Sequence, residues 1–241
     1  APGYLADFVV LDNLHDVNVE MVFKRGKLVY DGHEVEVAAP DIDPDILAGV
    51  LDTFHLPDVT PEQLRIGRAP LIGLIDGQIV TEDLGHADGI SGGICQMTVC
   101  ERHHDTGHVA SCYVRGYGIQ RGAVATSIAH DSHNIIACGV SPEDIAFAVN
   151  ELKKMHGGII VVENGQVQAR LPLEVAGLFT DRPLPEVNEK LEHCKAAAWA
   201  QGVNRGIDPF MTLSFASLPV IPALRLTTKG VFNVNTLSFV E

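Results

Sequence analysis

The sequence predicts an α+β fold, a mixed sheet domain with packed helices that is preceded by a few further β-strands. Short apolar runs bounded by glycine, proline, asparagine and aspartate recur along the 241 residues, as they do in strand-rich proteins. Two later segments, from Ser141 and from Pro185, carry apolar residues at helical spacing instead. Because strands come partly in hairpins and partly around a helix, the predicted class is α+β.

Three short strands open the chain, and they are predicted at 8–11, 19–23 and 27–30. A sheet this small is marginal in water, so it must pack on something else. The acidic, proline-containing residues 38–44 then predict a linker or crossover, and Thr60-Pro61-Glu62 predicts a later helix start. The predicted organisation is 1–37 for the first strands, 38–68 for the linker and 69–241 for the main domain.

Strands make up most of the main domain. Asp76-Gly77 and Asn164-Gly165 are dipeptides typical of two-residue hairpin turns, and each lies between two apolar runs. The end of the chain is strand-like between prolines and Gly230. The predicted strands are 71–75, 78–81, 94–100, 109–114, 123–128, 135–138, 159–162 and 167–171, with a strand-like tail at 219–240.

Two helices accompany these strands. Ser141 is followed by Pro142 and two acids, which indicates a serine cap with proline at the first helical position. The helical spacing continues until His156-Gly157-Gly158 ends the helix. A second amphipathic helix is predicted over 185–201. The apolar stretch 209–215 is either core or a docking face, and we expect core.

Composition and charge exclude several classes of partner. The formal net charge of −14 repels phosphate backbones and anionic lipid, so we expect neither nucleic acid nor a membrane as partner. No apolar run approaches the ~18 residues that span a bilayer. Five cysteines without a C-x-x-C pair fit a reducing cytoplasm, where we expect the protein to be soluble. The start lacks a methionine, so we expect the chain to begin partway through a longer protein.

Histidines mark the first candidate site. Six of the 11 histidines lie between positions 86 and 133, and histidine suits metal ligation and proton transfer near neutral pH. His130, Asp131, His133 and Asn134 fall in a polar turn between two apolar strands, where reactive groups are often found. The histidines could ligate a metal, or one could act as a base oriented by Asp131. Equally, Asp131 and Asn134 could be ordinary turn formers that bond their own backbone.

A second candidate is the loop from Glu101 to His108, which holds His103 and His104 and could supply acids, bases or anion contacts. Adjacent residues of an extended chain point to opposite faces, so at most one of the two histidines faces a given site. The competing interpretation, a solvated loop, is the one that we favour from the residues alone. The sequence lacks nucleotide-binding glycine patterns, a G-x-S-x-G elbow, H-E-x-x-H and any H-x-H pair.

These segments resemble the C-terminal domain of adenine deaminase. The residues that carry the resemblance include Arg121 to Ile136, Glu101-Arg102-His103-His104 with Thr106-Gly107, Leu171-Pro172-Leu173 with Ala176-Gly177-Leu178, and Pro209 to Leu213 with Leu218 to Pro222. The opening Gly3 to Asp12 is similar to the strand that closes the small β-sandwich after the barrel of amidohydrolases. Residues 1–37 are therefore expected to be strands of an amidohydrolase-type β-sandwich. The resemblance covers nearly the whole chain, in the order of the family's elements.

The resemblance implies an enzyme of which this chain is one part. Adenine deaminases hydrolyse adenine to hypoxanthine and ammonia, a purine salvage reaction, on a (β/α)₈ barrel that binds manganese, iron or zinc. The family's ligands include an H-x-H after the first barrel strand, which this sequence lacks, so the barrel and the metal ligands are expected upstream of Ala1. We therefore expect no metal or other cofactor in this chain, no activity from it alone, and an accessory, lid or oligomerisation role. The expected partners are the barrel, adenine as substrate of the parent, and further copies in a homo-oligomer.

The first hypothesis, which follows from this resemblance, makes the chain the accessory part of the deaminase. The polar turn that holds His130 and His133 then approaches the mouth of the barrel, as part of a lid or behind the groups that touch substrate. The candidate residues are His130, Asp131, His133, Asn134, His103 and His104. A second hypothesis makes the domain purely structural, with buried hydrogen bonds for the histidines and apolar interfaces around Phe210. A third, less favoured hypothesis makes the chain a separate histidine-rich metallohydrolase.

Overall fold

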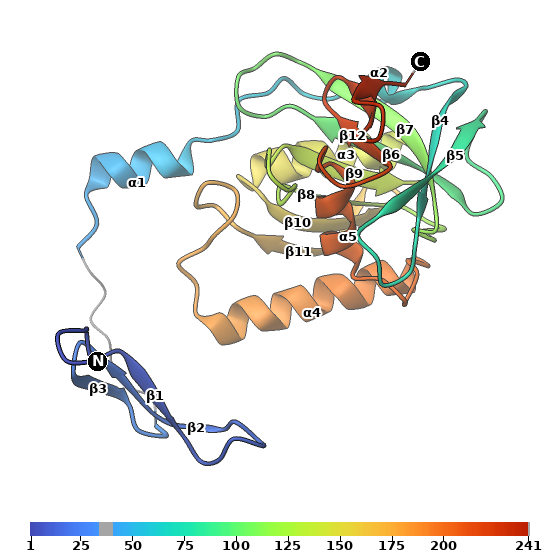
Figure 1. Ribbon diagram of the computed structural model, residues 1–241. Coiled ribbons are helices and arrows are strands. Elements are labelled where there is room, and N and C mark those ends of the chain that lie inside the picture. Colours follow the sequence, from blue (N-terminus) through green and yellow to red (C-terminus); the bar gives the residue numbers. More distant parts are fainter. Residues whose placement is uncertain (34–40, 241) are drawn as a thin grey trace. The chain divides into compact units, whose positions relative to one another are not determined.

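A computed structural model of the chain describes residues 1–33 and 41–240. The chain divides into two compact units, Ala1–Pro44 and Asp45–Glu241, which are considered separately below. Strands β1 to β3 lie in the first unit, and β4 to β14 lie in the second (Figure 1). The predicted boundary at residue 37 and the first residues of the predicted linker fall outside the described residues.

An eight-stranded mixed sheet is the centre of the second unit. Its strand order is β11-β10-β8-β9-β6-β7-β4-β5, and every neighbouring pair is antiparallel except β4 and β7, which are parallel. The sheet confirms the predicted α+β class with packed helices. Its strands are β4 (Ala69–Leu74), β5 (Thr81–Ala87), β6 (Ile94–Cys100), β7 (Val109–Arg115), β8 (Ala123–Thr126), β9 (Ile135–Gly139), β10 (Gly158–Glu163) and β11 (Gln166–Pro172).

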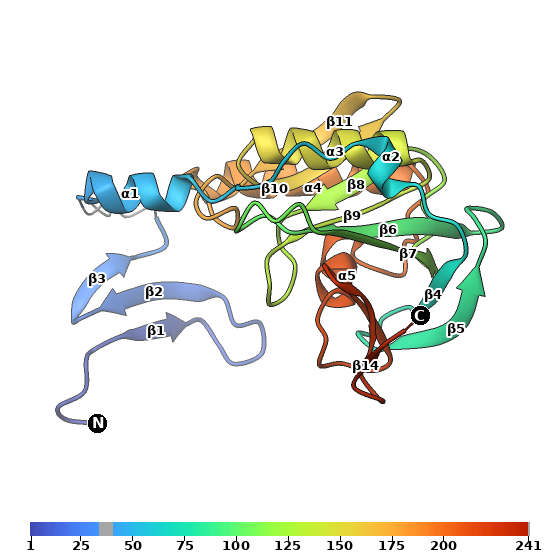
Figure 2. The same ribbon diagram turned by 90° about the horizontal axis from the view of Figure 1, so that it is seen from above.

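Helices cover both faces of this sheet. Ala123 and Ala125 of β8 pack with residues of α3 (Pro142–Lys154) in one apolar cluster. Val124, between them, belongs to a second cluster that contains residues of α4 (Leu184–Ala200) and α5 (Pro209–Ala216). Figure 2 shows α3 and α5 on opposite sides of the strands. Successive side chains of a strand point to opposite faces, so a strand covered on both sides reads as a continuous apolar run.

Helix α3 forms where the sequence predicts it. The Ser141 hydroxyl accepts a hydrogen bond from the backbone N–H of Asp144 at 3.2 Å, and Pro142 occupies the first turn. The buried Asp144 carboxylate also accepts hydrogen bonds from the backbone of Asn164 and Gly165, at 3.2 and 2.9 Å. Both of those residues have positive φ, of 52° and 68°, as a type I′ hairpin turn requires. The helix thereby holds the turn between β10 and β11.

Other predicted elements differ in detail. The Asp76-Gly77 turn forms, but the first pair of the β-ladder beside it is Leu74 with Thr81, so residues 78–80 are not paired. The predicted strand at 78–81 is therefore wrong. The polar, charged strand β5 begins at Thr81 and occupies the sheet edge, where charged side chains discourage pairing with other chains. Helix α1 (Pro44–Leu51) lies within the predicted linker and has no buried residue.

The remaining elements follow the sequence more closely. A capping box between Thr60 and Gln63 starts α2 (Pro61–Leu64), as predicted. The apolar stretch 209–215 forms α5, with the Asp208 carboxylate as its N-cap, and Phe210 and Leu213 are buried in the expected core. The tail forms a small antiparallel sheet of β12 (Leu224–Thr227), β13 (Gly230–Asn233) and β14 (Ser238–Phe239).

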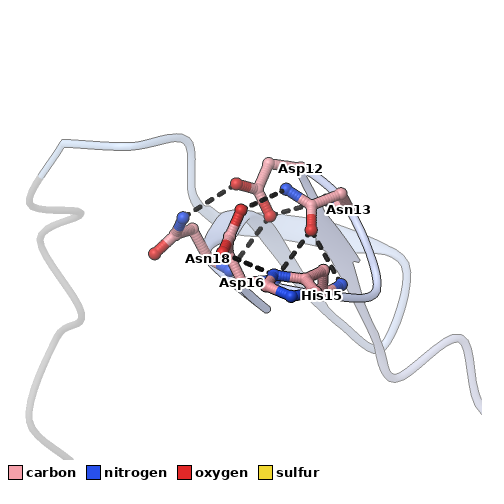
Figure 3. A network of polar contacts seen from close by, with 5 residues as sticks. All are labelled: Asp12, Asn13, His15, Asp16 and Asn18. Carbon is pink, nitrogen blue, oxygen red and sulfur yellow. Dashed lines mark hydrogen bonds and ion pairs between the residues drawn. The ribbon is translucent and has the colours of Figure 1, made fainter.

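The first unit is an antiparallel sheet in the order β1 (Phe8–Leu11), β2 (Val19–Lys24), β3 (Lys27–Tyr30), which confirms the three predicted strands. None of its described residues 1–33 is buried. Figure 3 shows the loop between β1 and β2, where the Asp12 carboxylate and the Asn13 amide accept backbone hydrogen bonds from the following residues. Such side-chain-to-backbone bonds are typical of turns.

Candidate functional site

The polar turn 129–134 connects β8 to β9 at one end of the sheet. His130 stacks on Phe215 of α5 with 5.4 Å between ring centroids, and its backbone N–H donates to the Ser214 carbonyl at 3.0 Å. The His130 Nδ1 atom lies 2.7 Å from the carboxylate of Asp131, whose side chain is exposed. These contacts orient the His130 ring against α5.

His133 adopts a left-handed backbone conformation, with φ of 48°, and its N–H donates to the Ala129 carbonyl at 2.6 Å. Its Nδ1 atom is buried and has no hydrogen-bond partner among the described residues. Burial, together with the positive charge of Arg102 and the proximity of His130, lowers the pKa of His133 below its ordinary value. This shift favours the uncharged form of the imidazole.

The loop after β6 lies against the turn. The Nε2 atom of His103 donates to the Ser132 carbonyl at 2.8 Å, and the Asn134 side-chain oxygen accepts from the Arg102 backbone N–H at 3.3 Å. The His104 side chain is exposed, with its ring centroid 6.2 Å from that of His103. The structure therefore brings His103, His133 and Asn134 together and leaves His104 on the solvent side.

Two buried residues of this loop, Glu101 and Arg102, lie in the predicted candidate segment but were not singled out as site residues. The Glu101 carboxylate accepts hydrogen bonds from the backbone N–H groups of His103 and His104 and from the Thr106 hydroxyl, at 2.6 to 3.2 Å. Burial opposes its ionisation, but these hydrogen bonds outweigh burial and lower the pKa of Glu101. Arg102, only 2% exposed, donates to backbone carbonyls of three separate segments. The sequence signal that could have identified Glu101 and Arg102 is their position as charged residues directly before two histidines.

The described residues contain no group of three or more histidine, cysteine, aspartate or glutamate side chains arranged to hold a metal ion. His130 and Asp131 pair with each other, and His103 bonds to a backbone carbonyl, so these side chains are already engaged. The described residues therefore offer no set of side chains that fits the metal that the resemblance implies.

A mostly apolar cavity of about 400 Å³ lies between α4, α5 and the sheet. Ile128, which precedes the turn, lines it together with Phe210 and Met211 of α5. Lys195 of α4 and the α5 cap Asp208 add a charged pair to its lining, 3.4 Å apart. The turn therefore lies next to a cavity whose lining is more apolar than the turn itself.

Comparison with known proteins places this arrangement in a family. The family model described as adenine deaminase C-terminal domain matches residues 76–238, which include every strand of the eight-stranded sheet except β4. The chain belongs to that family. The match includes the turn, the loop with Glu101 and Arg102, and helices α3 to α5.

Curated proteins similar to this chain are named adenine deaminase. The chain is 43% identical to adenine deaminase 2 of Carboxydothermus hydrogenoformans, over 100% of this chain and 44% of that protein. It is 42% identical to an adenine deaminase of Nitratidesulfovibrio vulgaris and 38% identical to that of Geobacillus kaustophilus, over 99% and 100% of this chain and 43% and 44% of those proteins. The chain thus spans less than half the length of these relatives. In the part that the structure describes, no helix combines the length and apolarity needed to cross a membrane.

Proposed function

We propose that this chain is the accessory C-terminal part of an adenine deaminase that converts adenine and water to hypoxanthine and ammonia in purine salvage. Membership of the C-terminal domain family and the names of relatives of more than twice its length support the proposal. The (β/α)₈ barrel, with its manganese, iron or zinc, belongs to the remainder of such an enzyme. The chain alone is inactive under this proposal, because the catalytic barrel lies in that remainder.

The turn 129–134 supports a role next to substrate. It is the one observation that carries this part of the proposal: a polar turn with two histidines is held in a defined conformation at the end of strands that are buried on both faces. Groups held rigidly by a scaffold suit substrate positioning. His133 would act as a hydrogen-bonding group of a lid, since its ring favours the uncharged form and its backbone N–H and carbonyl are both hydrogen bonded.

The test is a His133→Ala substitution in the full-length deaminase that carries this domain. We expect kcat/KM for adenine to fall by about tenfold or more, which corresponds to ~1.4 kcal/mol of lost transition-state stabilisation. His193→Ala is the matched control, because His193 is an exposed histidine on α4 and should leave turnover unchanged. Wild-type turnover in His133→Ala, at unchanged thermal stability, would reject the site and leave a structural role.

A second candidate function is docking, either to the rest of the deaminase or between copies in a homo-oligomer. The apolar cavity beside α5 favours it, as do the exposed side chains of Met211, Phe179 and Leu184. The two functions are compatible, but only the first predicts a change in kcat/KM for His133→Ala without a change in assembly.

A cytoplasmic setting is part of the proposal. All five cysteines are free thiols and all are buried, with the Sγ atoms of Cys95 and Cys138 3.5 Å apart. Burial raises the pKa of the Cys100 and Cys194 thiols to about 12, so these groups stay protonated and unreactive. Reduced thiols in such proximity fit a reducing compartment.

A further inference from the structure

Arg102 is a buried cation without a carboxylate at ion-pair distance among the described residues. Its guanidinium is hydrogen bonded to neutral oxygens instead. Nε donates to the His133 carbonyl at 2.5 Å, Nη1 to the Thr53 carbonyl at 2.8 Å and hydroxyl at 3.2 Å, and Nη2 to the Ala176 carbonyl at 2.9 Å. Only arginine supplies several donors in a rigid planar fork, so no other side chain reproduces this set.

The surroundings of Arg102 are shaped around it. The guanidinium lies over the Phe54 ring, 4.3 Å from its centroid. At Gly177, φ is +73° and an added Cβ would lie 2.8 Å from Phe54 and 3.0 Å from Nη2 of Arg102. The three segments joined by the guanidinium are separated from Arg102 by 31 to 74 residues in the sequence. Arg102 thus fixes the His133 turn against two loops that are distant along the chain.

The burial of its Nδ1 atom, in the turn that Arg102 fixes, decides where the His133 ring carries its proton. Nδ1 is buried without an acceptor, and the positive charge of Arg102 is close enough to disfavour a charged imidazole. A proton on Nδ1 would be a buried donor with no partner, the costlier of the two arrangements for a neutral ring. The neutral ring avoids that cost by carrying its proton on Nε2, which is not among the buried, unpartnered atoms.

We infer that Arg102 is a positioning residue for His133, and that it holds this histidine as a neutral imidazole with the proton on Nε2. The inference rests on the proposed role of the turn beside substrate. Under it, His133 offers a hydrogen-bond donor to an acceptor atom of the substrate and does not serve as a base through Nε2.

The charged groups around His133, taken together with its burial, lower its pKa. Arg102, His130 and His103 disfavour its protonation, whereas the exposed Asp131 favours protonation and is itself paired with His130. Arg102 is the one permanent positive charge in this set, because an arginine stays protonated even where burial lowers its pKa to about 10. Removing it should therefore change both the conformation of the turn and the titration of His133.

Nitrogen-15 NMR of the histidine rings, with amide hydrogen exchange, tests the inference on the 241-residue chain. In the wild type we expect the His133 proton on Nε2 and a pKa below the ordinary histidine value of 6.5. In Arg102→Gln the pKa of His133 should rise toward the ordinary value of 6.5. The His133 and Asn134 amides should exchange roughly tenfold faster or more. In Arg102→Lys the charge remains but the fork is lost, so exchange should accelerate while the pKa stays low.

Arg225→Gln and Arg225→Lys are the matched controls. Arg225 is equally buried and donates to four backbone carbonyls, yet none of its bonds reaches the turn 129–134. Its variants should cost comparable stability and leave the pKa and tautomer of His133 unchanged.

A wild-type His133 proton on Nδ1, or equal pKa changes in the Arg102 and Arg225 variants, would overturn the inference. If Arg102→Gln fails to fold, the tautomer of His133 in the wild type and the amide exchange and pKa in Arg102→Lys still test the inference. Because none of these measurements uses activity, their failure is distinct from wild-type turnover in His133→Ala, which would reject the proposed function.

Discussion

At the scale of single residues, the family domain stabilises buried charge with backbone groups. Arg102 and Arg225 both donate to carbonyl oxygens of loops, and burial lowers the pKa of each to about 10. Glu101 is the counterpart, a carboxylate that accepts from backbone N–H groups. In each case removal of the charged group would leave several backbone groups unpaired, which is the costly outcome for a buried site.

Glu101 predicts a pH-dependent contribution to stability. Its pKa is lower in the folded state than its ordinary value of 4.5, so the contribution is present above that value and is lost as pH falls through the folded pKa. We expect Glu101→Gln to lower the free energy of unfolding by about 1–3 kcal/mol at pH 7. Urea unfolding of both proteins at pH 7 and pH 3 measures this, and the difference should shrink at the lower pH.

Glu62→Gln is the control for the Glu101 measurement, since Glu62 is an exposed carboxylate in the first turn of α2. A Glu101→Gln effect that is the same at both pH values would contradict the assignment, because it would arise from shape and not from charge.

Part of the candidate site could be predicted from the sequence. The turn at 130–134 was identifiable because its polar residues interrupt two apolar runs. Arg102 lies in the second candidate loop, but its buried role could not be predicted. An arginine in a polar loop is most often solvated, and its bonds reach residues 31 to 74 positions away. The pairing of His103 with Ser132 depends on the same long-range packing.

At the scale of elements, the hairpin of β10 and β11 depends on α3. Asp144 both belongs to the first turn of the helix and accepts the two N–H groups of the Asn164-Gly165 turn. The local turn signal and a long-range contact therefore favour the same structure, a consistency that is typical of sequences that fold to one state.

Asp144→Ala should destabilise the domain by about 1–3 kcal/mol, because two backbone donors lose a charged acceptor. Glu143→Ala is the matched control: it is the preceding residue, and its bond to Arg65 lies at the surface, where such pairs contribute up to about 1 kcal/mol. Chemical denaturation of the two variants gives the comparison. Equal losses would show that the negative charge at the helix start, and not the hairpin contact, is what matters.

The elements that were predicted correctly are those with strong local signals. Capping residues identify the starts of α2 and α3, and the Asn164-Gly165 dipeptide identifies its hairpin. The edge strand β5 lacks such a signal because its residues are polar. The parallel contact of β4 with β7 and the pairing of β6 with β9 are set by packing across the whole sheet, which local patterns do not encode.

At the scale of the whole molecule, the two units differ in how much they bury. The second unit has apolar clusters on both faces of its sheet, whereas the described residues 1–33 contain no buried side chain and expose Phe8, Val9 and Met21. A three-stranded sheet without a core contributes little stability by itself.

We therefore expect a variant that lacks residues 1–44 to unfold at the same temperature as the complete 241-residue chain, within about 2 °C. Differential scanning calorimetry measures this, with circular dichroism to confirm that the eight-stranded sheet persists. A drop of several degrees would show that the first strands stabilise the second unit.

The coverage of the sheet by late helices also matters while the protein is being made. Val124, Ile136 and Val161 face the layer that α4 and α5 supply, yet these helices follow all eight strands in the chain. When β11 has left the ribosome, one apolar face of the sheet has no covering layer, and α4, α5, β12 and β13, which follow in the chain, supply that layer. Translation pauses within that interval would expose the nascent chain to aggregation, so steady elongation or chaperone capture at this stage protects the yield of folded protein.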